Sequence, residues 1–394
     1  MRTIGVVLAV ALIAALAVGK AWTRPAAGAL QCQPAQPFRA AFPSWSPAGD
    51  SVAFSVPNAE SAAVVRATPG TVRYTGLATS FDSAPTRIVW APVGEMIAWQ
   101  KRTGAISIAP QGRNTFEREL VHAQFGTVTE LGDWSPDARH LVFMRDGRIY
   151  TVDASTEEIR HIADGLRPTW SPDGQEIAFV AGRNVGISPN RPVDLDVIRP
   201  DGSGQRQVVA GLPSIDTIAW SPDSSKLAFV GTVIGIVPRE GGAVSYSKPA
   251  QSPLEWRPNG ISYNNLQGPA PAGIHAMRLD PETGATTALT RLPPGFQGTF
   301  LSASADGRHA AYGLDVNDER VGVRIVDAFG RNDQPMLACH GGAHPDRIRG
   351  SRLNDIVRVR GGGLDRVSCG RGQDTVYADR RDFVATDCEH VVRG

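Results

Sequence analysis

The sequence predicts an all-β protein: a β-propeller of seven blades, with six blades as the alternative, followed by a short parallel β-roll. Three observations predict this fold. A turn-and-strand motif recurs seven times at spacings of 36 to 50 residues, a second repeat of about nine residues follows it, and glycine (42) and proline (29) are abundant among the 394 residues. Many short strands joined by tight turns produce such a composition.

The first element is an export signal, residues 1–29. Arg2 precedes an apolar run from Ile4 to Val18, and small residues that include Ala27-Gly28-Ala29 follow. A basic start, an apolar middle and an A-x-A site are typical of a secretory signal peptide, with cleavage near Ala29. The alternative is an uncleaved N-terminal membrane anchor, although the run is short for a membrane span. Either reading predicts a secreted or extracytoplasmic protein of the cell envelope.

Residues 30–338 carry the seven-fold motif, whose clearest copy is WSPDGQEIAFV, Trp170 to Val180. Ser171-Pro172-Asp173-Gly174 has the residues of a β-turn. The strand after it, Ile177 to Val180, is apolar on both faces, as in a sheet that is covered on both sides. Several units then show two further strands, and four strands in about 43 residues are the pattern of a propeller blade. One blade cannot bury both of its faces, so the blades must stack.

The motif W-S-P-D-G followed by I-A-F-V resembles the repeat of the TolB-like propeller family, over roughly residues 38–336. The resemblance implies a rigid propeller that presents a face and a central channel to a partner. Four units depart from the pattern, because Ala48 and Val93 replace Asp, Arg257 replaces Ser, and Ala303 replaces Trp. These departures leave the number of blades open between seven and six.

Two sets of motif residues could be structural or functional. Six of the eight tryptophans open a motif: Trp45, Trp90, Trp134, Trp170, Trp220 and Trp256. Recurrence at equivalent positions predicts wedges between adjacent blades, and an aromatic ligand platform is the alternative. Asp137, Asp173 and Asp223 share one turn position, which predicts turn formers in preference to a ring of catalytic carboxylates.

Residues 339–394 carry a different repeat. Five aspartates recur at intervals of nine, ten, nine and eight, and each is followed two residues later by Ile or Val. They are Asp346, Asp355, Asp365, Asp374 and Asp382. This pattern matches the β-roll repeat G-G-x-G-x-D-x-U-x, and the tail resembles the haemolysin-type (RTX) calcium-binding repeat.

The resemblance implies calcium as a cofactor, held by loop carbonyls and carboxylates. The candidate metal-binding residues are Gly361, Gly363, Asp365, Gly370, Gly372 and Asp374, with weaker copies at Asp346 and Asp355, where His344 and Leu353 replace a glycine. Asp365 and Asp374 are expected to share one edge of the roll. The alternative is a roll without a bound cation, held by its core and a disulfide. Ten arginines against eight acidic residues in this tail lower the affinity expected for a cation.

The four cysteines allow three pairings. Cys369 and Cys388 lie close together in the tail, whereas Cys32 precedes the first unit and Cys339 follows the last. A closed propeller brings its first and last blades side by side. The sequence therefore predicts a Cys32–Cys339 disulfide that clasps the ring and a Cys369–Cys388 disulfide in the tail. A metal site at Cys339, His340 and His344 is the less favoured alternative.

Charge and motifs limit the function. A net charge of +1 argues against binding to nucleic acid or to anionic membranes. The sequence has no G-x-S-x-G elbow, no sialidase-type Asp box, no zinc-ligand spacing and no phosphate-binding loop. It predicts an exported, non-catalytic binding or scaffold protein, with a protein or an envelope ligand as partner and membrane contact only through an uncleaved N-terminal segment. The alternative is a propeller enzyme, a hydrolase or lyase, with its active site at the central channel, because such residues come from separate blades and leave no local motif.

Overall fold

The computed structural model describes residues 30–31, 41–56, 61–66, 74–76, 87–110, 117–181, 192–266, 274–290, 296–316, 319–327, 334–335, 339–340, 347–349, 356–359, 363–371 and 373–394. The predicted signal segment, residues 1–29, lies outside these ranges. Over the described ranges every regular element is a strand, and none of them contains a helix long and apolar enough to cross a membrane. The strands within these described ranges form nine four-stranded sheets, seven antiparallel and two parallel.

Each antiparallel sheet consists of four consecutive strands. The first three sheets are β2 (Ala41–Trp45), β3 (Ser51–Val56), β4 (Ser61–Arg66) and β5 (Tyr74–Gly76); β6 (Arg87–Trp90), β7 (Met96–Gln100), β8 (Ile106–Pro110) and β9 (Arg118–Val121); and β10 (Thr129–Trp134), β11 (His140–Arg145), β12 (Arg148–Asp153) and β13 (Ile159–Asp164).

The remaining four repeat the same order. They are β14 (Leu166–Trp170), β15 (Ile177–Ala181), β16 (Val193–Ile198) and β17 (Arg206–Leu212); β18 (Thr217–Trp220), β19 (Lys226–Val230), β20 (Val233–Pro238) and β21 (Ser245–Pro249); β22 (Gln251–Arg257), β23 (Gly260–Leu266), β24 (Ile274–Leu279) and β25 (Thr286–Ala288); and β26 (Phe296–Ala303), β27 (His309–Val316), β28 (Glu319–Asp327) and β29 (Gln334–Pro335).

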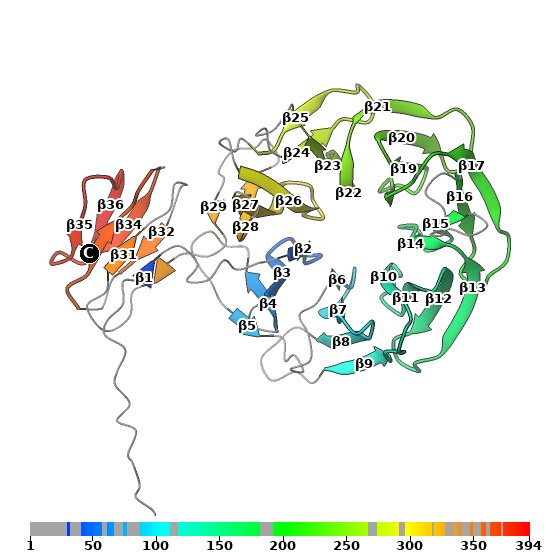
Figure 1. Ribbon diagram of the computed structural model, residues 1–394, viewed down its shortest axis with the longest axis horizontal. Coiled ribbons are helices and arrows are strands. Elements are labelled where there is room, and N and C mark those ends of the chain that lie inside the picture. Colours follow the sequence, from blue (N-terminus) through cyan, green and yellow to red (C-terminus); the bar gives the residue numbers. More distant parts are fainter. Residues whose placement is uncertain are drawn as a thin grey trace, which may run out of the picture.

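The seven sheets are arranged in a ring, with the first strand of each sheet innermost (Figure 1). The first and last sheets meet, because the Trp45 indole N–H donates to the Ser302 carbonyl at 3.0 Å and the Trp45 ring stacks on His309. The protein is therefore a β-propeller.

The hydrophobic core lies between neighbouring sheets. Val180 and Leu195 of the fourth sheet form one buried cluster with Trp220 and Phe229 of the fifth. The whole of β15 is buried, as its two apolar faces predict. Each sheet therefore depends on its neighbours for the burial of its faces.

The tail forms the two parallel sheets. One sheet has the order β1 (Leu30–Gln31), β31 (Arg347–Arg349), β33 (Arg366–Ser368) and β35 (Phe383–Val384). The other has the order β30 (Cys339–His340), β32 (Ile356–Arg358), β34 (Thr375–Ala378) and β36 (His390–Arg393). Consecutive strands of the tail alternate between the sheets, and their apolar residues, such as Val367 and Val376, are buried between them.

One strand departs from the predicted domain boundary at residue 30. Leu30 and Gln31 were expected to begin the propeller, but β1 pairs in parallel with Ile348 and Arg349 of the tail. Strand β31 leaves one edge open on the side away from β33, and the extended N-terminal segment satisfies its backbone groups. Residues from before and after the propeller therefore build this tail sheet.

Candidate functional site: the central channel

The innermost strands enclose a cavity of about 1080 Å³ along the axis of the ring. Residues from all seven sheets line it, and the motif tryptophans are among them. Five innermost strands end at their motif tryptophan, β22 ends one residue after Trp256, and β26 ends at Ala303 in the tryptophan position. The motif turn, S-P-D-G in its clearest copy, follows each of them. One mouth of the channel is therefore surrounded by motif residues, and the other by residues at the strand starts.

The motif tryptophans pack between neighbouring sheets. Five of the six are buried, and Trp256 is half-buried against the cluster around Leu254 and Tyr263. The indole N–H groups donate to the preceding sheet: Trp90 to the Ser44 carbonyl at 2.8 Å, Trp134 to Val89 at 3.4 Å and Trp220 to Thr169 at 3.3 Å. Each acceptor lies one residue before a motif start. The indole N–H of Trp170 is buried without such an acceptor.

The turn aspartates bind their own turns. Asp137, Asp173 and Asp223 accept a hydrogen bond from the motif serine at 2.5 to 2.6 Å, and another from the backbone N–H two residues later. The hydroxyl of Ser221 and the backbone N–H of Ser225 lower the pKa of Asp223 to about 2. Asp306 of the divergent seventh unit makes the same contact with Ser304 at 2.6 Å.

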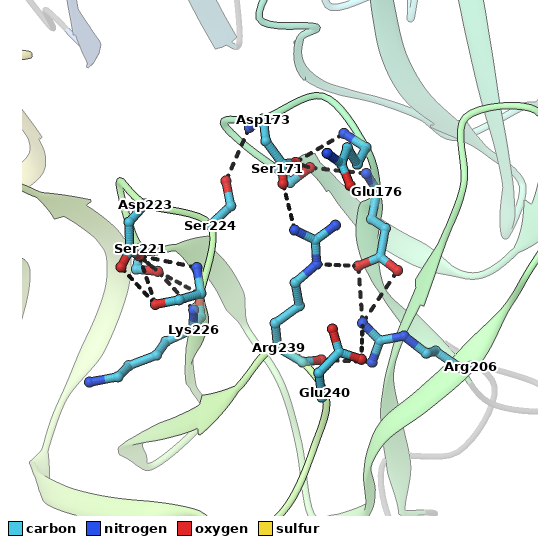
Figure 2. Close-up of polar contacts among 12 residues, drawn as sticks. Ser171, Asp173, Glu176, Arg206, Ser221, Asp223, Ser224, Lys226, Arg239 and Glu240 are labelled. Carbon is cyan, nitrogen blue, oxygen red and sulfur yellow. Dashed lines mark hydrogen bonds and ion pairs between the residues drawn. The ribbon is translucent and has the colours of Figure 1, made fainter.

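Asp173 also takes part in an ion-pair network that joins the fourth and fifth sheets (Figure 2). Arg239, just after β20, binds Asp173 at 2.5 Å and Glu176 at 2.8 Å, and its guanidinium lies 5.5 Å from the centre of the Trp220 ring. Arg206 binds the same Glu176 at 3.0 Å and donates to the Arg239 carbonyl at 2.7 Å. No sequence pattern pointed to Arg239, because its partners lie more than 60 residues away along the chain.

Two channel carboxylates also join neighbouring sheets. Asp133 accepts the Trp170 backbone N–H at 3.1 Å and the Thr169 hydroxyl at 2.8 Å. Glu255 accepts the Ala303 backbone N–H at 2.8 Å. Both acids stand one residue before a motif start, and both bind the motif start of the following sheet. Burial raises the pKa of Asp133, although the hydrogen bonds from Thr169 and Trp170 act in the opposite direction.

The two mouths of the channel differ in chemistry. Arg87, Glu130, Arg167 and Asp216 line the channel at or near the starts of the innermost strands of four consecutive sheets. Their charges alternate in sign around the ring, and each comes from a separate motif unit, so no local pattern could reveal them. The opposite mouth is lined by tryptophans and by the motif prolines Pro92, Pro136, Pro172, Pro222 and Pro258.

The prediction that Asp365 and Asp374 share one edge of the roll is wrong. Asp365 and Asp374 do not share an edge, because Asp365 precedes β33 in one sheet and Asp374 precedes β34 in the other. Nine residues take the chain from one sheet to the other, so the same-sheet neighbour lies two repeats away. Accordingly, the Asp365 backbone N–H donates to Asp382 at 3.1 Å, and that of Asp374 donates to Glu389 at 2.8 Å.

These contacts do not fit the predicted calcium site. Asp365 and Asp374 are both buried, but they stand at different sheets and cannot ligate one ion in the predicted way. Over the described part of the chain, no group of three or more His, Cys, Asp or Glu side chains is placed to hold a metal ion. Gly363 and Gly370 are described, whereas four other candidate positions lie outside the described residues: Asp346, Asp355, Gly361 and Gly372. Calcium binding stays a prediction.

Cys369 and Cys388 form a disulfide in the tail core, with Cα atoms 5.1 Å apart. Cys32 lies outside the described residues. The Cys32–Cys339 clasp therefore stays a prediction.

No family model matches the sequence, and no curated protein matches it. Among solved structures, an oligogalacturonate lyase in complex with manganese is 16% identical with a TM-score of 0.53, covering 62% of this chain and 74% of that one. The chain folds as a β-propeller. A protein described as TolB from Agrobacterium tumefaciens is 20% identical (TM-score 0.43, 56% of this chain and 87% of that one). A nidogen–laminin complex chain is 12% identical (TM-score 0.43, 58% and 88%). Likeness at these identities concerns the fold alone.

Proposed function

We propose that the protein is an exported, non-catalytic binding or scaffold protein whose propeller binds a partner protein at the proline- and tryptophan-lined mouth of its channel. In this proposal the seven antiparallel sheets are the seven blades of one closed TolB-like ring. The two parallel sheets are a β-roll appended to it. The Cys369–Cys388 disulfide supports export, because structural disulfides persist in oxidising compartments.

The proposal rests on the hydrogen bonds that the carboxylates lining the channel make to neighbouring sheets. Among the described residues that line the channel, the carboxylates are Glu130, Asp133, Asp216 and Glu255. Two of these four, Asp133 and Glu255, accept the backbone N–H at the motif start of the next sheet. A carboxylate that links sheets in this way stabilises the ring and is poorly placed to exchange protons with a substrate. The channel therefore supports a rigid binding surface better than an acid–base centre.

The mouth of the channel that the motif tryptophans and prolines line, here called the motif mouth, suits a protein partner. Proline side chains are rigid and largely apolar, so covering them with a partner costs little conformational entropy. Five of the six tryptophans beside them are buried and so are held in place by packing. Such a preformed rim matches the apolar centre of a protein interface.

Site-specific photo-crosslinking in the native envelope fraction tests the proposal. A crosslinking side chain at Val93, which is 54% exposed beside Pro92 at the motif mouth, should capture one defined partner. The matched control is Ile159, which is 44% exposed on the outermost strand of its sheet. Capture of the same species at both positions would contradict binding at the mouth.

One observation favours the enzyme alternative. Burial raises the pKa of Asp133 within a cavity that also holds Arg87, Glu130 and Asp216, and groups with perturbed pKa values cluster at active sites. A hydrolase or lyase acting in the channel would then use these side chains. Turnover of an acidic oligosaccharide by the mature protein, lost in Asp216→Asn while the variant melts like wild type, would favour this alternative.

A further inference from the structure

The last turns of the tail are bound by charged side chains of the tail itself. Asp387 accepts the Cys369 backbone N–H on one carboxylate oxygen at 3.1 Å, and the Gly370 N–H on the other at 2.9 Å. The Ser368 hydroxyl donates to the second oxygen at 3.2 Å. These donors stand where β33 leads into the glycine loop 370–372, which the repeat predicts to offer carbonyls to a cation.

Two further carboxylates make similar contacts. Asp382 accepts the Asp365 N–H at 3.1 Å on one oxygen and the Asp379 N–H at 2.7 Å on the other. Glu389 accepts the Asp374 N–H at 2.8 Å. Asp382 and Glu389 therefore each tie one turn to the turn beside it in the same sheet.

A positive side chain occupies turn carbonyls in the same region. One Arg393 nitrogen, Nη1, donates to the Asp379 carbonyl at 2.9 Å and to the Asp382 carbonyl at 3.1 Å. In the Asp379–Asp382 turn, a guanidinium therefore binds the carbonyls of the first and last residues, and a carboxylate binds the Asp379 amide.

Calcium needs a different arrangement. It takes six to eight oxygen ligands whose lone pairs point at the ion. Amide hydrogens directed at the carboxylates bring positive charge to the place where that ion would bind, and they form charge-assisted hydrogen bonds that are stronger than neutral ones. A carboxylate that already accepts such hydrogen bonds gains little from a cation.

We propose that the carboxylates of Asp382, Asp387 and Glu389, together with the Arg393 guanidinium, close the last turns of the tail in place of the calcium ion that the repeat predicts. The tail then keeps its fold without calcium, with the Cys369–Cys388 disulfide joining β33 to the segment before β36.

Hydrogen–deuterium exchange on the full-length oxidised protein tests this proposal. Peptides covering residues 363–394 should exchange equally in millimolar calcium and in chelator. In Asp387→Asn, exchange at Cys369 and Gly370 should accelerate about tenfold or more in both conditions, because two charge-assisted bonds are weakened. Arg393→Ala should accelerate exchange around residues 379–382, whereas the matched control Arg381→Ala, an exposed arginine in the same turn, should not.

The comparison of exchange in calcium and in chelator uses the wild-type protein, so it remains informative even if a variant misfolds. Slower exchange of these peptides on adding calcium would overturn the proposal. Restoration of the Asp387→Asn variant by calcium would overturn it as well, since a cation would then be able to close the same turn.

Discussion

At the residue scale, the same side chain has different surroundings in different units. The Trp90 indole donates to a carbonyl of the preceding sheet, whereas the Trp170 indole N–H is buried without an acceptor. Both rings are 8% exposed and fill the same kind of gap between sheets. Hydrogen bonding and packing can therefore be separated by substitution.

Trp170→Ala should lower the free energy of unfolding by about 3–5 kcal/mol through the cavity it leaves. Trp170→Phe should cost less than Trp90→Phe by about 1 kcal/mol, because only Trp90 loses a hydrogen bond. Chemical denaturation of the three variants measures both differences. An alanine variant as stable as wild type would show that Trp170 is not an inter-sheet wedge.

The turn aspartates predict a stability that depends on pH. Hydrogen bonds from Ser221 and Ser225 lower the pKa of Asp223 from 3.8 to about 2. A depressed folded-state pKa adds stability that is complete above pH 4 and is lost as the pH falls towards 2. Melting temperatures of wild type and Asp223→Asn should therefore converge between pH 4 and pH 2. A difference that stays constant over this range would show that the carboxylate charge is not what binds the turn.

At the element scale, the sequence predicted local features well and contacts between sheets poorly. The S-P-D-G turns and the buried strand β15 are local, because turn chemistry and strand periodicity act over a few neighbouring residues. The contacts of Arg239 and Asp133 depend on how one sheet faces the next, which no short pattern encodes. The error about Asp365 and Asp374 has the same origin, since a nine-residue period does not show that alternate repeats enter different sheets.

Arg239 should contribute more to stability than an equivalent surface arginine. Its side chain is 17% exposed and binds both Asp173 and Glu176, so Arg239→Ala leaves two partly buried carboxylates with weaker partners. The expected loss is roughly 1–3 kcal/mol in the free energy of unfolding. Arg139→Ala is the control, because Arg139 is 78% exposed and lies 3.8 Å from Asp137, and its effect should be close to zero. Equal effects of the two substitutions would mean that the network in Figure 2 adds no stability.

At the scale of the whole molecule, a strand that precedes the propeller in the sequence pairs with the tail that follows it. Strand β1 pairs with β31, and Cys32 follows β1 directly. The predicted Cys32–Cys339 disulfide would therefore link the segment after β1, in one tail sheet, to β30 in the other.

Peptide mapping without reduction should recover a Cys32–Cys339 peptide apart from the Cys369–Cys388 peptide. Closing a loop of about 300 residues would add roughly 5–6 kcal/mol in the chain-entropy model. Recovery of Cys339 joined to Cys369 would show that the Cys32–Cys339 disulfide does not form.

The central claim is that the channel carboxylates hold the ring together and leave the protein a binding module. Its most direct test is equilibrium unfolding of Asp133→Ala beside Glu130→Ala, two carboxylates of the same sheet that line the same channel. Asp133→Ala should lose about 1–3 kcal/mol, because the Trp170 N–H and the Thr169 hydroxyl lose their acceptor, and Glu130→Ala should change stability little. An Asp133→Ala protein that unfolds like wild type would contradict the claim and leave this carboxylate available for chemistry.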